Sequence, residues 1–234
     1  MLTIITPALL LLTFVAFSIA FWLYNTSKVQ PVLCSLLHPL VTAPLLVSAV
    51  LLLSNIDYGE YRNANQPLFF LLGTATVALA VPLHQQFHHI LSLAKPLLLT
   101  LLFGASFAVI SALAIAWLLG ANGETLISIA PKSVTTPIAL GIAEKIGGQP
   151  GLTAGIVVFT GVIGAIFGPV LFRWLGTTDD RVKGFVLGIC AHGVGTARAF
   201  EISAKCGAFS SLGLGLTGAI TAIVLPWIVI YVLK

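Results

Sequence analysis

Charged side chains are scarce in this chain of 234 residues: 8% are Asp, Glu, Lys or Arg, whereas 58% are hydrophobic. A soluble domain carries roughly 25% charged residues, so a water-soluble fold of this composition would precipitate. The 11 basic and 7 acidic residues give a formal charge of +4 and are scattered through short loops without a long basic run. This distribution argues against a nucleic-acid partner.

The sequence also lacks the motifs of enzymes and of disulfide frameworks. It contains no GxSxG, HExxH, CxxC or Walker loop, and no polar stretch large enough for a soluble active site. Its three cysteines, Cys34, Cys190 and Cys206, lie in or beside apolar segments, where we expect small buried side chains. His84 and His88 have the spacing of zinc ligands on a helix, but no carboxylate or thiol stands nearby. We therefore predict no enzyme activity, no metal site and no cofactor.

Long apolar runs are what the chain has in abundance. A hydrocarbon core about 30 Å thick needs about 20 apolar residues in a helix. The runs here are apolar all round, which excludes the alternating strands of a transmembrane β-barrel, and Trp and Tyr residues lie near their ends, as interfacial belts require. The sequence thus predicts an all-α, polytopic transmembrane protein, with its clearest spans at residues 2–23, 31–54, 96–119, 151–175 and 210–233.

The first run is expected to be a retained helix, because the first basic residue, Lys28, follows it instead of preceding it as in a signal peptide. No Arg-rich and Ser-rich transit sequence is present either, so we expect the bacterial cytoplasmic (inner) membrane. The Lys and Arg residues of the loops do not fall on one side, which leaves orientation and the choice between six and eight crossings open.

Three further stretches, residues 67–90, 127–148 and 184–207, are helical in pattern but interrupted by Gly, Pro or charged residues. Irregular backbone at membrane depth is tolerated only where it is buried in protein or lines a cavity. We therefore predict broken or re-entrant helices that line the functional interior. The segment order also repeats at an offset of about 120 residues, as in many secondary transporters. We expect a single membrane domain over 1–234 with two structural repeats, about 1–120 and 121–234, in which 67–90 meets 184–207 near the membrane centre.

The interrupted stretches hold the candidate binding residues. In the first, hydroxyls ahead of Pro82 can satisfy freed backbone groups or a ligand, although a kinked packing helix is the alternative. In the second, Pro137 suits the first turn of a helix whose free amides would face a lysine and three hydroxyls, which predicts an anion site. The alternative there is a surface loop with a snorkelling lysine. The residues are Thr74 and Thr76 in the first stretch, and Lys132, Ser133, Thr135 and Thr136 in the second.

The third stretch, AHGVGTARAFE, places ionisable residues in an apolar run. Such a residue costs about 3 kcal/mol at membrane depth and usually faces the protein interior with a partner. We predict that Arg198 binds an anion with its planar fork, together with Lys132, while Thr196 assists and His192 is a candidate for proton coupling. Arg198 and Glu201 share a helix face, so the alternative is a purely structural ion pair.

Four pieces of the sequence resemble the LrgB/CidB family of bacterial membrane proteins. They are TVALAVPL at 76–83, PKSVTTPIALGIAEKIGG at 131–148, LTAGIVVFTGVIGAIFGPVL at 152–171 and AHGVGTARAFE at 191–201. The family often has Gly-Pro where this chain has Gly73-Thr74, which leaves the helix break there to Pro82.

The resemblance implies two functions. Members are described as antiholin-like proteins that affect murein hydrolase activity and lysis beside a smaller LrgA/CidA-type membrane protein, whereas a related plastid carrier moves glycolate and glycerate and some bacterial members are linked to pyruvate. A holin has no use for Lys132 and Arg198 beside broken helices, so we favour a transporter of small carboxylates of the pyruvate, glycolate, glycerate or lactate type. We also expect an LrgA/CidA-type partner or self-association, because small residues let helices approach closely; these are Gly161, Gly164, Ala165 and Gly168.

Overall fold

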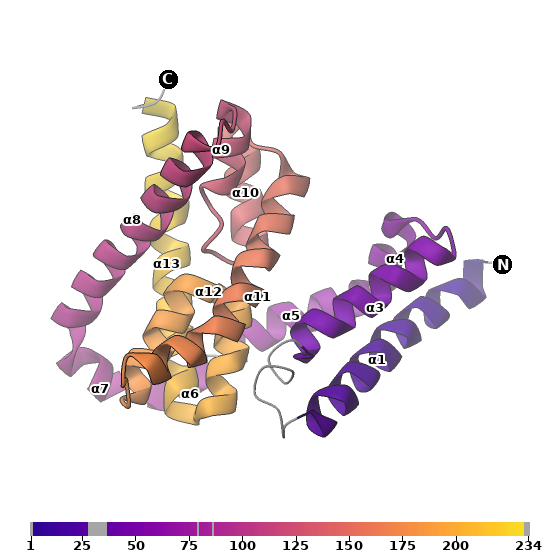
Figure 1. The fold of residues 1–234 in the computed structure, drawn as a ribbon, viewed down its shortest axis with the longest axis horizontal. Helices are drawn as coiled ribbons and strands as arrows, with labels where there is room; N and C mark the ends of the chain where they lie inside the picture. Colours follow the sequence, from indigo (N-terminus) through magenta and orange to yellow (C-terminus); the bar gives the residue numbers. More distant parts are fainter. Residues whose placement is uncertain (1, 28–36, 79, 86, 232–234) are drawn as a thin grey trace. The chain divides into compact units, whose positions relative to one another are not determined.

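The computed structural model describes residues 2–27, 37–78, 80–85 and 87–231, which are helical and contain no strand (Figure 1). The chain divides into two compact units, residues 1–78 and 79–234. Among the described helices, five are long and apolar enough to cross a membrane, with lengths of 20 to 28 residues. The prediction of an all-α, multi-pass membrane protein is confirmed.

The first unit contains α1 (Leu2–Thr26), α3 (Pro39–Leu53), α4 (Tyr58–Ala64) and α5 (Gln66–Ala78). Buried side chains of α1 and α3, including Leu9 and Val47, form its core. Asp57 caps the short helix α4 by accepting a hydrogen bond from the Gly59 amide at 2.7 Å. The predicted span at 2–23 is therefore present, whereas α3 covers only part of the expected span at 31–54, because 28–36 lie outside the described residues.

The second unit is organised around α13, which runs along its whole length, with α9 and α10 beside the C-terminal part of α13 and α12 beside its N-terminal part (Figure 1). Its last helix begins at Ala204 and not at residue 210, because Ser203 has an extended backbone that ends the preceding helix. The elements are α6 (Ala80–Gln85), α7 (Phe87–Ser92), α8 (Ala94–Leu118), α9 (Gly123–Ile129), α10 (Thr136–Ile146), α11 (Pro150–Trp174), α12 (Asp180–Ile202) and α13 (Ala204–Tyr231).

Helix α12 is one of these five by length and composition, but it folds back on itself and is not one straight rod. The Ser203 hydroxyl donates a hydrogen bond of 2.8 Å to the Asp180 carboxylate, although 23 residues of straight helix would separate them by about 35 Å. The reversal occurs at His192, whose φ of 41° and ψ of −131° are not helical. Beyond it, Gly195 lies against the Leu187 carbonyl, so the two halves run antiparallel. The predicted stretch at 184–207 is therefore a re-entrant helical hairpin.

The stretch at 127–148 also turns back on itself, so that its end lies next to its beginning. The Ser128 hydroxyl, at the end of α9, accepts a hydrogen bond of 2.8 Å from the Gln149 amide, 21 residues later. The Thr153 hydroxyl donates to the Ser128 carbonyl at 2.9 Å, which fastens α9 to the start of α11. Between these points the chain turns near Lys132, and α10 runs back until Gly147, at φ 86°, ends it. This segment is a re-entrant loop and helix.

The two re-entrant elements lie at opposite ends of α11. The first closes at Gln149, where α11 begins, and the second opens at Asp180, shortly after α11 ends at Trp174. The 25 residues of α11 span about 37 Å, as much as a helix needs to cross a bilayer, and the two elements open toward opposite ends of this helix. The prediction of broken or re-entrant helices is confirmed. The two structural repeats, and the meeting of 67–90 with 184–207, stay predictions; within this unit α6 packs against α13.

Close contacts between helices hold the hairpin in place. Gly184 lies against the Cys206 carbonyl of α13, and Gly188 against the Ser210 carbonyl, so a side chain at either position would collide with backbone. Three glycines of α11 accept α12 in the same way: a Cβ would come within 2.6 Å of His192 at Gly161, within 2.6 Å of Ala191 at Gly164 and within 2.8 Å of Leu187 at Gly168. These small residues therefore pack against another helix of the same chain. They no longer support the expected association with a partner.

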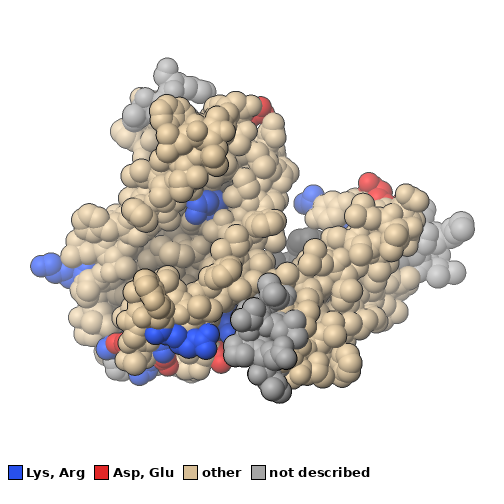
Figure 2. Space-filling model, viewed as in Figure 1, with Lys and Arg blue, Asp and Glu red and all other residues tan. Residues whose placement is uncertain are grey.

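Charged side chains gather at the base of the hairpin. Figure 2 shows a largely uncharged surface on the second unit, with basic and acidic side chains where α11 ends and α12 begins. Asp179 caps α12 through the Arg181 amide, and the Arg181 guanidinium beside it lowers the pKa of its carboxyl to about 2. Lys183 pairs with Asp180 at 3.1 Å. A charged rim of this kind suits the level of the lipid headgroups.

Candidate functional site

The tips of the two re-entrant elements lie at neighbouring levels beside the middle of α13. The first half of α12 runs along the first half of α13, so that Gly188 lies level with Ser210 and Leu214. The first residues of α10 contact α13 at Gly218, one helical turn beyond Leu214. A Cβ at Gly218 would come within 2.8 Å of the Ile138 side chain. The hairpin tip and the N-terminus of α10 are therefore at neighbouring levels, deep in the second unit.

The imidazole of His192 is held at the hairpin tip by α11. Its Nε2 atom lies 2.8 Å from the Val157 carbonyl oxygen, and the residue is only 4% exposed. A carbonyl oxygen can only accept, so Nε2 carries the hydrogen of this bond. The edge of the ring lies directly over Gly161, where any larger residue would displace it. Packing and hydrogen bonding thus fix both the position and the tautomer of His192.

Two buried hydroxyls support the reversal from the side of α13. The Thr196 hydroxyl donates to the His192 carbonyl at 2.9 Å and lies 2.9 Å from the Ser210 hydroxyl. A hydroxyl has a single hydrogen, and that of Thr196 is already used, so Ser210 is the donor in the second bond. Sequence reasoning missed Ser210, which marks only the start of an apolar run. A serine amid small residues was the available signal.

Lys132 brings positive charge to the same place. Its side chain is half-buried, with Nζ 3.4 Å from the Ser133 hydroxyl, and it interacts electrostatically with His192 and Cys190 at the hairpin tip. Ser133 itself is buried. The site therefore combines one ammonium group with hydroxyls from two elements that enter from opposite ends of the unit.

The N-terminus of α10 adds backbone donors. Thr135 occupies the N-cap position with an extended backbone and makes no capping hydrogen bond through its side chain, and Pro137 lies in the first turn, as predicted. Thr135 and Thr136 are half-buried. The first amides of the helix and the positive end of its dipole therefore face the turn that carries Lys132, an arrangement that favours an anion.

The remaining predicted residues lie elsewhere. Arg198 forms an ion pair with Glu201 on the second half of α12, about 9 Å along the helix from His192; this is the pairing given above as the structural alternative. Thr74 is exposed in α5 of the first unit, where its hydroxyl donates to the Leu71 carbonyl at 2.8 Å. The side chain of Thr76 lies outside the described part of the chain. The structure thus groups Lys132, Ser133, His192 and Thr196, and leaves ligand binding by all these residues a prediction.

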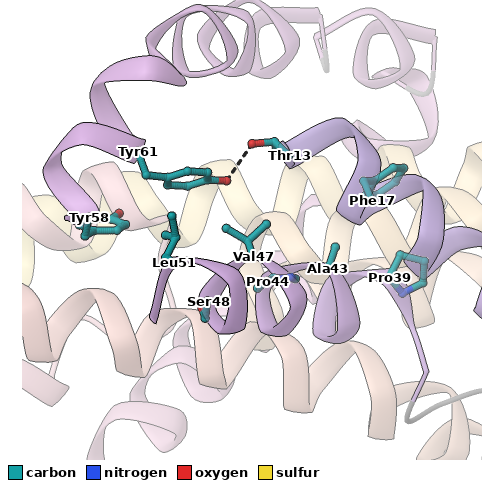
Figure 3. Close-up of a pocket in the computed structure, with 10 residues that line it drawn as sticks. All are labelled: Thr13, Phe17, Pro39, Ala43, Pro44, Val47, Ser48, Leu51, Tyr58 and Tyr61. Atoms are coloured by element: carbon teal, nitrogen blue, oxygen red, sulfur yellow. Dashed lines mark hydrogen bonds between the residues drawn. The ribbon is translucent and has the colours of Figure 1, made fainter. Parts of the chain in front are cut away.

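A groove in the first unit contains none of the predicted residues. It has a cavity volume of about 360 Å³ and lies between α1, α3 and α4 (Figure 3). At its edge the Thr13 hydroxyl lies 2.9 Å from the Tyr61 hydroxyl and donates to Asn65 Oδ1 at 2.7 Å. The other lining side chains are mainly apolar, including Phe17, Val47 and Leu51. The polar atoms at this edge are already bonded to one another, so the groove resembles a packing defect more than a site for a polar ligand.

Two opposed re-entrant elements whose tips enclose polar groups within apolar helices define a class: multi-pass membrane proteins with an interior polar site. Residues 13–231 match the model of the LrgB-like family, and the chain belongs to that family. The resemblance in the four sequence pieces is thereby confirmed.

Individual relatives agree with this assignment. The chain is 36% identical over 190 residues to YwbG of Bacillus subtilis (strain 168), which covers 81% of this chain and 84% of that protein. A protein of Haemophilus influenzae is 35% identical over 188 residues, 80% of this chain and 81% of its own. The holin-like protein CidB of Staphylococcus epidermidis is 28% identical over 195 residues, 83% and 85% of the two chains. No solved structure matches the chain.

Proposed function

We propose that this protein is a transporter of small carboxylates of the pyruvate, lactate, glycolate or glycerate type in the bacterial cytoplasmic membrane. The observation that carries the proposal is the approach of two re-entrant tips, which come from opposite ends of α11, to one half-buried lysine. Half-helix ends that point at a midplane site are the usual way in which secondary transporters bind anionic groups. A pore needs no such site.

The charges at the site suit a substrate with one carboxylate. Lys132 supplies one positive charge and the first turn of α10 supplies amide donors, while the hydroxyls of Ser133, Thr135 and Thr136 can bond the carboxylate or a neighbouring 2-hydroxy or 2-oxo group. Arg198 is neutralised by Glu201. In this proposal it binds substrate only when the pair opens during transport.

Uptake into liposomes tests the proposal. The purified protein should take up at least one of labelled pyruvate, lactate, glycolate and glycerate. Lys132→Ala should lower this uptake by about 10-fold or more, since a hydrogen bond to a charged group contributes about 1.5–3 kcal/mol. Lys145→Ala is the matched control, because Lys145 is exposed at the opposite end of α10, and it should transport like the parent.

Arg198 is tested separately. Arg198→Lys keeps the charge but loses the planar fork, so weakened uptake would support a role in substrate binding. If both Arg198→Lys and Lys132→Ala take up carboxylates at the parent rate, the site lies elsewhere and Arg198 is only the structural partner of Glu201.

The second candidate is a holin-like regulator of murein hydrolase activity and lysis that acts with an LrgA/CidA-type partner. It is favoured by the similarity to a protein named holin-like protein CidB. Liposomes loaded with a large dye separate the two candidates. Leakage of dye without saturable carboxylate uptake would favour the holin-like function.

A further inference from the structure

The backbone of His192 is unusual for a residue with a side chain. Its φ of 41° and ψ of −131° lie near the first central position of a type II′ turn, about +60° and −120°, where glycine is the normal residue. Gly193 follows immediately, so the chain has glycine next to this position but not in it. A strained conformation of this kind, observed at a buried tip, points to a side chain that is needed there.

The hydrogen bonds leave one nitrogen of His192 available for protonation. Nε2 donates to the Val157 carbonyl, and the backbone carbonyl of His192 is occupied by Thr196. Nδ1 is therefore the basic nitrogen of the neutral ring. Protonation at Nδ1 keeps the Nε2 bond intact, so the imidazole can change its charge without losing its position.

The elements around His192 offer few charged groups. Among the described residues, α11 presents Val157 and Gly161 to the ring, α13 presents Ser210 behind Thr196, and the turn before α10 brings Lys132, the charged group that interacts with the imidazole. On α12 itself the nearest titratable group is Cys190, a thiol. A protonated His192 would thus add a second positive charge beside Lys132, which is unfavourable in a buried site unless an anion lies there too.

We propose that His192 takes up a proton at Nδ1 together with the substrate carboxylate, so that acid anion and proton move across the membrane as a pair. This inference rests on the proposed function. The proton comes from the aqueous side to which the site is open, stays on Nδ1 while the anion is bound near Lys132, and is released on the opposite side. By linkage, each ligand strengthens the binding of the other.

Proton uptake on binding tests the proposal directly. Pyruvate is added to the purified protein in detergent, in weak buffer with a pH indicator, at a pH where His192 of the empty site is neutral. The parent should take up close to one proton for each pyruvate bound, whereas His192→Gln and His192→Gly should take up none. The glycine variant relieves the backbone strain at this position, which keeps a folded variant available. His88→Gln, at an exposed histidine of α7, should behave like the parent.

The pH dependence of binding provides a second measurement. Pyruvate affinity in the parent should weaken by about tenfold per pH unit as the pH rises from the titration of the empty site to that of the loaded site, because one proton is linked to one anion in this window, and it should be nearly flat in His192→Gln. Lys132→Arg should keep the slope, since arginine stays charged throughout.

Each result has a clear meaning. Pyruvate binding without proton uptake in the parent, or equal proton uptake in the parent and both His192 variants, overturns the proton proposal while carboxylate transport stands. A slope that disappears in Lys132→Arg but persists in His192→Gln assigns the titration to the lysine instead. If the parent neither binds nor transports any of the four acids, the proposed function fails, and the inference fails with it.

Discussion

The hairpin of α12 predicts a disulfide that a straight transmembrane helix forbids. The change is Asp180→Cys with Ser203→Cys, in a protein whose cysteines at 34, 190 and 206 have been replaced by alanine. Straight α-helix would place the two positions about 35 Å apart, whereas a disulfide requires Cα atoms within about 7 Å. In the structure the two side chains share a hydrogen bond of 2.8 Å. Mild oxidation of the protein in membranes should therefore link them in high yield.

Mass spectrometry of tryptic peptides provides the assay. The linked product joins peptide 174–181 to peptide 199–205, because trypsin cleaves after Arg173, Arg181, Arg198 and Lys205. The control pairs Asp180→Cys with Gly193→Cys at the open hairpin tip, about 20 Å away by helical rise, and it should stay unlinked. Absence of the 180–203 link, with both thiols accessible to a small alkylating reagent, would refute the re-entrant topology.

Three further predictions concern stability, measured by equilibrium unfolding in mixed micelles. Gly188→Ala should lower the free energy of unfolding by about 1–3 kcal/mol, because its Cβ collides with the backbone of α13. Gly215→Ala is the control: it has open space around it and should leave the free energy of unfolding unchanged or raise it by up to about 1 kcal/mol. Equal stability of the two variants would contradict the packing. Ser128→Ala should cost about 1–3 kcal/mol by leaving a backbone amide unpaired, and an unchanged midpoint would argue against the closure of the first re-entrant element. Thr13→Val should cost a similar amount because it removes the donor to Asn65; a stable variant would show that this bond is dispensable.

The sequence predicted the apolar spans well because each is a local property of about 20 consecutive residues. It also located the interruptions in the stretches 127–148 and 184–207 correctly, since Pro137 and the glycines around His192 are local signals. It did not distinguish a kink from a full reversal at His192. That distinction depends on contacts between distant residues, such as Asp180 with Ser203 and Gly188 with Ser210.

In the candidate site, too, the sequence revealed what is local and missed what depends on contacts between distant residues. Lys132 and His192 stood out because charge and imidazole are rare in apolar runs, and the structure brings them within electrostatic range. The pairing of Arg198 with Glu201 followed from their spacing. Ser210 escaped notice because its role arises only when α13 packs behind Thr196.

The packing also constrains how access to the site can alternate. The contacts at Gly184 and Gly188 join α12 to α13 at backbone level, and those at Gly161 and Gly164 join it to α11. Close-packed surfaces of this kind do not slide continuously, so the hairpin should move as one body with α11 and α13. The 180–203 disulfide lies inside that body and should leave carboxylate uptake at the parent rate. Loss of uptake on oxidation, restored by a reductant, would instead show that the hairpin opens during transport, and would make α12 itself the gate.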